Sequence, residues 1–218
     1  MDELNMEERL PYAAFFELMG LSFSYPDRKL LGLIQTGEYK DAYLELTGLV
    51  GLDGKTISDM TATLDNMTQR DAEELFHELR VEYTRLFVGT PKPLVSLSEG
   101  VWLGHKRGDN VVLAIINGST IAVEKFMKSC GIFPSKTNRE PIDTIYTECE
   151  FMQYLLTKSS FPEDFARTPI EAYDYFLKEH MAKWIPGFAE QVQEITETAW
   201  FASLVRTMCA YVELLAFK

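Results

Sequence analysis

Cysteine and histidine, the residues that most often bind metals or act as nucleophiles, are scarce in this chain. Its 218 residues include three of each, and none stand in a C-x-x-C or H-x-x-x-H pattern. The sequence therefore indicates no zinc site and no disulfide framework. A G-x-S-x-G nucleophile elbow is also missing, so we expect no catalytic residue, no bound metal and no cofactor. We expect Cys130, Cys149 and Cys209 to be reduced thiols of a cytoplasmic protein.

Basic residues are fewer than acidic residues in this chain. The chain has 21 Lys and Arg against 33 Asp and Glu, a net charge of −12. Such a surface repels nucleic acid and anionic membranes and favours a cationic partner, although solubility alone explains the acidity equally well. No apolar run of about eighteen residues occurs, and the acidic start MDELNMEERL is unlike a signal peptide. The sequence thus predicts neither a membrane span nor an export signal.

Helical spacing of apolar residues dominates the rest of the chain and predicts an all-α fold. We expect a single helical domain, residues 1–218, of about ten helices. The expected ranges are 6–24, 27–35, 38–49, a helix of about ten residues N-capped by Ser58, 69–88, 119–130, 140–157, 168–180, 185–196 and 197–216. Thr168 is the expected N-cap of the 168–180 helix, with Pro169 at its first position.

Residues 89–118 break this pattern. They contain Pro91, Pro93 and several glycines, and their one β-branched run, Val111–Ile116, is too little for a sheet. We interpret the segment as an extended connector or hinge that divides the chain into 1–88 and 119–218. Such a connector is compatible with a monomer or with a domain-swapped dimer. Within it, the basic turn Gly104–Gly108 leaves open a small nucleotide-dependent enzyme, although no phosphate-binding loop sequence is present.

The most informative segment is REPIDTIYTECEF, residues 139–151. Pro141 suits the first position of a helix, and the apolar residues that follow repeat at steps of three and four. The polar side of that helix would carry Glu140, Asp143 and Thr144. Carboxylates at a helix start complement the helix dipole, and Asp143 is placed to accept from free backbone N–H groups. The alternative is that these acids bind a cation, most naturally a peptide arginine.

Three blocks of the sequence, in order, resemble the TorD/DmsD/NarJ-type redox-enzyme maturation chaperones. EPIDTIYTECEFM is similar to the family's E-P-x-D-H signature, and EYTRLFVGTPKPLVSLSEGVW to its aromatic-x-x-L-F segment with a following S-V-W/Y. FLKEHMAKWIPGF resembles its F-x-x-x-H-x-x-x-W-x-x-x-F helix. Two positions depart from the family pattern. Thr144 replaces the histidine, and the proline after L-F-x-G comes one place late, at Pro91.

The resemblance implies a cytoplasmic chaperone without catalysis of its own. It would bind the twin-arginine signal segment of a molybdoenzyme subunit and hold the apoprotein until its molybdopterin is inserted. The alternative within the family is that the protein is an assembly factor for a non-exported molybdoenzyme subunit whose leader lacks twin arginines. The peptide-binding residues implied are Glu140, Pro141, Asp143 and Tyr83, with Thr144 at the family's histidine position. Apolar contacts to the peptide would come from Phe87, Trp102 and Trp184.

Overall fold

The regular secondary structure of this protein is helical. A computed structural model describes residues 4–89, 92–108, 118–133, 141–162 and 165–216. Within those ranges all regular elements are helices. The predicted all-α class is therefore confirmed. The chain forms two compact units, Met1–Gly20 with Ser96–Trp184, and Leu21–Val95 with Ile185–Lys218. One boundary falls inside the predicted connector, but each unit is built from two separate stretches of chain.

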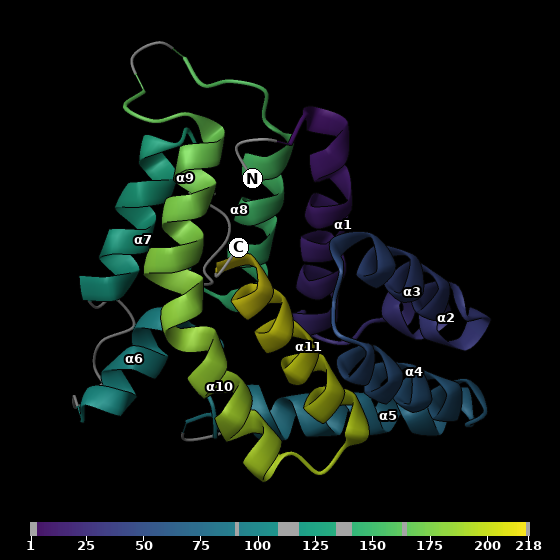
Figure 1. Cartoon of the computed structure of the whole chain (residues 1–218). Coiled ribbons are helices and arrows are strands. Elements are labelled where there is room, and N and C mark those ends of the chain that lie inside the picture. Colours follow the sequence, from purple (N-terminus) through teal and green to yellow (C-terminus); the bar gives the residue numbers. More distant parts are fainter. Residues whose placement is uncertain (1–3, 90–91, 109–117, 134–140, 163–164, 217–218) are drawn as a thin grey trace. The chain divides into compact units, whose positions relative to one another are not determined.

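The first unit contains the helices around the described part, residues 141–151, of the segment 139–151, which we call the acidic segment (Figure 1). They are α6 (Glu99–Arg107), α7 (Gly118–Ser129), α8 (Ile145–Thr157), α9 (Pro169–Phe176) with its π-helical continuation η3 (Leu177–Met181), most of α1 (Met6–Phe23) and the first turn of α10 (Ala182–Ile195). Thr168 caps α9 as predicted. Its hydroxyl accepts from Glu171 N–H, and the Glu171 carboxylate accepts from Thr168 N–H.

Aromatic side chains form much of the core of the first unit. Phe126 of α7 stacks on Phe176 of α9 with ring centroids 5.8 Å apart, and Phe151 of α8 meets Phe176 edge-on at 4.9 Å. Helix α1 approaches α8 closely at Gly20, where an added Cβ would lie 3.4 Å from the Cβ of Cys149. Each of these contacts buries apolar surface between neighbouring helices and holds α8 in place.

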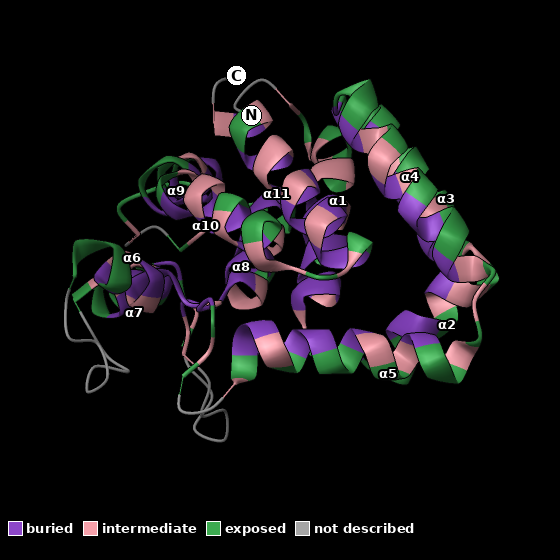
Figure 2. Cartoon of the chain, turned by 90° about the horizontal axis from the view of Figure 1, so that it is seen from below, coloured by how far each residue is buried: buried purple, intermediate pink, exposed green. Residues whose placement is uncertain are grey.

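The second unit is built from α2 (Arg28–Thr36), α3 (Glu38–Val50), α4 (Gly54–Thr68), α5 (Ala72–Tyr83), the π-helix η1 (Thr84–Val88), the rest of α10 and α11 (Ala199–Ala216). Asp27, Asp53 and Asp71 cap α2, α4 and α5 through their carboxylates. Helices α3, α4 and α5 each show one buried and one exposed face (Figure 2). This pattern is the amphipathic periodicity that the sequence predicted.

Helix α11 is the one described helix that is long and apolar enough to cross a membrane, and 56% of it is buried. Its polar groups face α4 instead of lipid. Ser203 and Thr63 are hydrogen-bonded at 2.9 Å, and Arg206 pairs with Asp59. The helix is therefore a core element of the second unit.

Several local predictions differ from the structure. The 89–118 connector is partly helical, because α6 occupies Glu99–Arg107. The helix predicted from residue 140 begins at Ile145 instead. Ser58 lies inside α4, which starts earlier with Asp53 as its N-cap. The 69–88 helix changes at Thr84 to π-helical turns, in which Gly89 N–H donates to the Thr84 carbonyl at 2.8 Å.

Candidate functional site at the junction of α6 and α8

The residues just before α8 pair with the residues that start α6. Ser98 and Thr144 form an isolated antiparallel bridge, and Glu99 N–H donates to the Asp143 carbonyl at 2.9 Å. These bonds hold Asp143 in the extended segment ahead of α8. The predicted helical turn at Pro141 does not form, because the backbone of this segment is used for bonding to α6.

The Asp143 carboxylate caps a helix, but that helix is α6. Its Oδ2 accepts from Gly100 N–H at 2.9 Å and from the Thr120 hydroxyl at 2.8 Å. Ser98, the N-cap residue of α6, makes no side-chain cap bond. Asp143 therefore supplies the acceptor that the first turn of α6 otherwise lacks, and its negative charge complements the positive end of that helix.

Two further carboxylates are buried in the same unit as Asp143. Asp143 and Glu148 are 0% exposed and Glu99 is 3% exposed. Burial raises the pKa of Glu148 well above its usual range, and the negative charges of Glu99 and Asp143 raise it further. The protonated form of Glu148 is thus strongly favoured. Its Oε2 accepts from the indole N–H of Trp184 at 3.1 Å.

His180 is the basic partner of this acidic group. Its Nδ1 lies 3.0 Å and 3.2 Å from the two carboxylate oxygens of Glu99, and its ring stacks on Phe176 at 4.7 Å. His180 was not among the residues predicted for the site. The spacing of Phe176, His180 and Trp184 at intervals of four was the available signal, since residues four apart share one helix face.

Two carboxylate oxygens of this group have no hydrogen-bond donor among the described residues. They are Asp143 Oδ1 and Glu148 Oε1, and both are inaccessible to solvent. A buried acceptor without a donor costs about 1–3 kcal/mol. No set of three ligating side chains in the described ranges is arranged to hold a metal ion. A proton or an N–H cation would complement these oxygens, because both supply the missing hydrogen-bond donor.

Of the predicted peptide-binding residues, Glu140 lies outside the described residues. Pro141 is half-buried. Thr144 is buried, and its hydroxyl is 2.9 Å from that of Thr147. The rings of Trp102 and Trp184 lie 6.4 Å apart, so two of the predicted apolar contacts are neighbours in the first unit.

Tyr83 and Phe87 belong to the second unit. Tyr83 is 4% exposed, its hydroxyl donates to the Phe23 carbonyl at 3.1 Å, and its ring meets that of Phe87 at 5.1 Å. In this structure both side chains are part of an aromatic core.

The basic turn at Gly104–Gly108 forms the end of α6. Gly108 has a φ of 76°, and its N–H donates to the carbonyls of Gly104 and His105. Lys106 lies 5.2 Å from the ring centroid of Trp102. Basic residues in the last turn of a helix complement its dipole, so this turn has a structural explanation without a nucleotide.

Comparison with known proteins places the chain in a family. The family described as nitrate reductase delta subunit matches residues 54–190. The chaperone protein TorD of Photobacterium profundum is 23% identical over 67% of this chain, and that of Vibrio parahaemolyticus 21% identical over 72%. The perchlorate reductase assembly chaperone protein of Dechloromonas aromatica is 26% identical over 59%. The chain spans 66%, 71% and 57% of the lengths of these relatives, respectively.

A solved structure supports the fold. The crystal structure of a redox enzyme maturation protein from Archaeoglobus fulgidus matches 92% of this chain and 93% of its own with a TM-score of 0.56 and 21% identity. The family match covers the α6–α8 junction, His180 and Trp184. The chain therefore belongs to the nitrate reductase delta subunit family, which includes the TorD-type maturation chaperones.

Proposed function

We propose that this protein is a cytoplasmic maturation chaperone, without enzymatic activity, for a molybdenum-dependent redox enzyme. It binds the N-terminal signal segment of the apoprotein and keeps it from export until the cofactor is inserted. The observation that carries the proposal is the α6–α8 junction, where buried carboxylate oxygens of Asp143 and Glu148 lack a donor. The names of the relatives, as TorD and as an assembly chaperone of perchlorate reductase, agree with it.

An arginine of the signal segment is the proposed ligand of Asp143 Oδ1, whereas Glu148 keeps its proton. A guanidinium presents five N–H donors in a planar fork, and charge-assisted bonds to a carboxylate are about twice as strong as neutral ones. The net charge of −12 would attract a basic leader over long distances. Since Asp143 is fully buried, the segment from Pro141 to Thr144 has to move when the arginine enters.

Apolar residues would bind the hydrophobic part of the leader. Trp102 and Trp184 are the proposed contacts in the first unit, since they lie beside each other and Trp184 bonds to Glu148. Glu140 is a further proposed anchor. Tyr83 and Phe87 are proposed contacts in the second unit, where their aromatic core would have to open. Thr144 gives this chain a small hydroxyl at the family's histidine position, which changes the shape of the site.

The test is titration calorimetry with a twin-arginine signal peptide. The double variant Asp143→Asn, Glu140→Gln should bind with about 1–3 kcal/mol less free energy, the scale of lost charge-assisted bonds. The amide oxygen of Asn can still accept from Gly100 N–H, so the fold should persist. The exposed Glu150→Gln is the matched control. Unchanged affinity in a folded double variant would reject the anchor assignment.

A paired-lysine version of the same peptide separates two client types. A lysine keeps the charge but lacks the fork, so a twin-arginine site should bind it more weakly. Equal affinity would instead favour an assembly factor for a non-exported subunit without a twin-arginine leader.

A further inference from the structure

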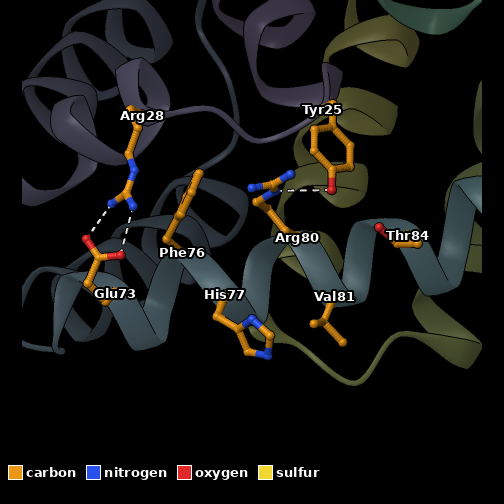
Figure 3. Close-up of a pocket in the computed structure, with 8 residues that line it drawn as sticks. All are labelled: Tyr25, Arg28, Glu73, Phe76, His77, Arg80, Val81 and Thr84. Carbon is orange, nitrogen blue, oxygen red and sulfur yellow. Dashed lines mark hydrogen bonds and ion pairs between the residues drawn. The ribbon is translucent and has the colours of Figure 1, made fainter.

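The second unit has an open pocket of about 520 Å³ beside α5. Residues of α5 from Glu73 to Val81 line it together with Thr84 of η1, and Tyr25 and Arg28 form the facing wall (Figure 3). Phe76 and Arg80 lie in the middle of the α5 face. The pocket is lined wholly by residues of the second unit and includes none of the residues of the α6–α8 junction.

The two arginines of this pocket differ in their partners. Arg28 is paired with Glu73 by two bonds, of 2.5 and 2.8 Å, and its guanidinium lies 4.2 Å from the Phe76 centroid. Its charge is thus already neutralised. Arg80 is not paired in this way, since no carboxylate in the described part of the chain forms an ion pair with it.

Arg80 is held instead by aromatic groups. Its guanidinium carbon lies 4.9 Å from the ring centroid of Tyr25 and 5.3 Å from that of Phe76, and its Nε donates to the Tyr25 hydroxyl at 3.1 Å. Hydrogen bonds with Thr84 and then with Arg80 lower the pKa of Tyr25. These contacts use one N–H of Arg80 and orient the guanidinium plane. The two terminal nitrogens have no acceptor among the described residues, and they form the fork that binds a carboxylate.

The surroundings favour a single negative charge over a polyphosphate. The backbone N–H groups at the start of α2 are bound by Asp27, and those at the start of α5 by Asp71. Asp27 and Asp71 therefore already occupy the N–H groups with which these two helix starts would bind a phosphate. Glu73 offsets Arg28, so one guanidinium charge, that of Arg80, is left over in the pocket.

Apolar surface lies next to this charge. Val81 is 51% exposed, and the ring of Phe76 is partly accessible. The rest of this protein's surface repels acidic ligands, because the chain has a net charge of −12. A peptide carboxylate flanked by an apolar side chain is complementary to both the fork and the exposed apolar groups.

We propose that the α5 pocket binds an acidic peptide segment, with Arg80 as the bidentate anchor of one carboxylate and with Phe76 and Val81 in contact with a neighbouring apolar side chain. This site is separate from the proposed signal-peptide site. It would give the protein a second peptide-binding site, which prefers an acidic peptide, whereas the proposed signal-peptide site prefers a basic one.

The test is nuclear magnetic resonance of the full-length protein labelled with ¹⁵N. The probe is the acetylated and amidated pentapeptide Gly-Leu-Asp-Phe-Gly, and its partner has Asn in place of Asp. We expect saturable shifts of the Arg80 Nε–H signal and of the α5 amides with the acidic peptide, and at least about tenfold weaker binding of the amide version. The variant Arg80→Gln should bind about tenfold more weakly, the effect of losing a charge-assisted bond.

Two control variants make the result specific. Arg70→Gln removes a guanidinium that is paired with Glu78 and should leave binding unchanged. Asp143→Asn should also leave it unchanged, which separates this site from the proposed signal-peptide site. Equal affinity of the acidic peptide for Arg80→Gln and the wild type would overturn the proposal. Inorganic phosphate that shifts these signals more strongly than the peptide would overturn the peptide assignment.

Discussion

The carboxylate of Asp143 accepts a hydrogen bond from the backbone N–H of Gly100, 43 residues away in the sequence, at 2.9 Å. This bond links the start of α6 to the segment before α8. The same carboxylate keeps its other oxygen without a donor among the described residues. One side chain thus has a structural bond on one oxygen and an unused acceptor on the other, and the following predictions test these two roles.

Removing the Asp143 carboxylate should weaken the junction. Asp143→Ala leaves Gly100 N–H and the Thr120 hydroxyl without their acceptor. We expect the free energy of unfolding to fall by about 1–3 kcal/mol, the cost of leaving a buried group unpaired. Urea denaturation followed by circular dichroism measures it, with Glu150→Gln as the exposed control. Asp143→Asn should lose less, and equal losses for the Ala and Asn variants would argue against the capping bond.

Stability should fall with rising pH because of Glu148. Its pKa is raised in the folded protein, so above the usual glutamate value of 4.5 the folded state holds a proton that the unfolded state has released. Between that value and the folded-state pKa, the free energy of unfolding falls by about 1.4 kcal/mol per pH unit for one such proton.

The variant Glu148→Gln stays neutral and can still accept from Trp184. It should therefore lack this slope, and the stability difference between variant and wild type should grow as the pH rises above 4.5 toward the raised pKa of Glu148. Urea titrations at each pH provide the curves. Parallel curves for the two proteins would show that Glu148 does not hold the extra proton.

His180 should be needed to keep Glu99 buried. His180→Ala leaves that carboxylate without its ring partner, and leaving a buried polar group without its hydrogen-bond partner costs about 1–3 kcal/mol. Lys178→Ala, an exposed change in the same π-helix, is the control and should alter stability by less than about 0.5 kcal/mol. A small loss for His180→Ala, similar to that of the control, would mean that Glu99 is satisfied by other groups.

The hydroxyl of Tyr83 should contribute to stability through its bond to the Phe23 carbonyl. Tyr83→Phe keeps the ring contacts with Tyr25 and Phe87 and removes the hydroxyl that makes that bond, at a cost of about 1 kcal/mol. Thermal unfolding measures the change, and Tyr25→Phe serves as a comparison at a half-exposed tyrosine. Titration of the same Tyr83 variant with the signal peptide tests whether the hydroxyl also contributes to binding.

Local signals in the sequence predicted much of the fold correctly. Thr168 and Pro169 mark the start of α9 because the capping bonds join residues three apart. The bounds of α1, α3 and α7 agree with the predicted ranges to within one residue. Helix α6 was missed, because it has only nine residues with two glycines and depends on a cap from Asp143, which is distant in the sequence.

The candidate site was predicted only in part, because its structure also depends on contacts between residues that are distant in the sequence. The acidic segment was identified, but its helix was predicted to start at residue 140, five residues before the observed start at Ile145, since Pro141 suits a helix start when no competing partner is considered. The bridge between Ser98 and Thr144 is that partner. The burial of Glu148 and its bond to Trp184 depend on contacts between α8 and α10, which no local pattern specifies.

The most direct measurement of the central claim follows the arginine of the peptide itself. A twin-arginine signal peptide, labelled with ¹⁵N in its guanidinium groups, is titrated with the wild-type protein and with Asp143→Asn. We predict that one arginine Nε–H signal shifts on binding to the wild type and that this shift is lost with the folded variant, with about tenfold weaker binding. The same shift and the same affinity with both proteins would contradict the assignment of Asp143 as the arginine anchor.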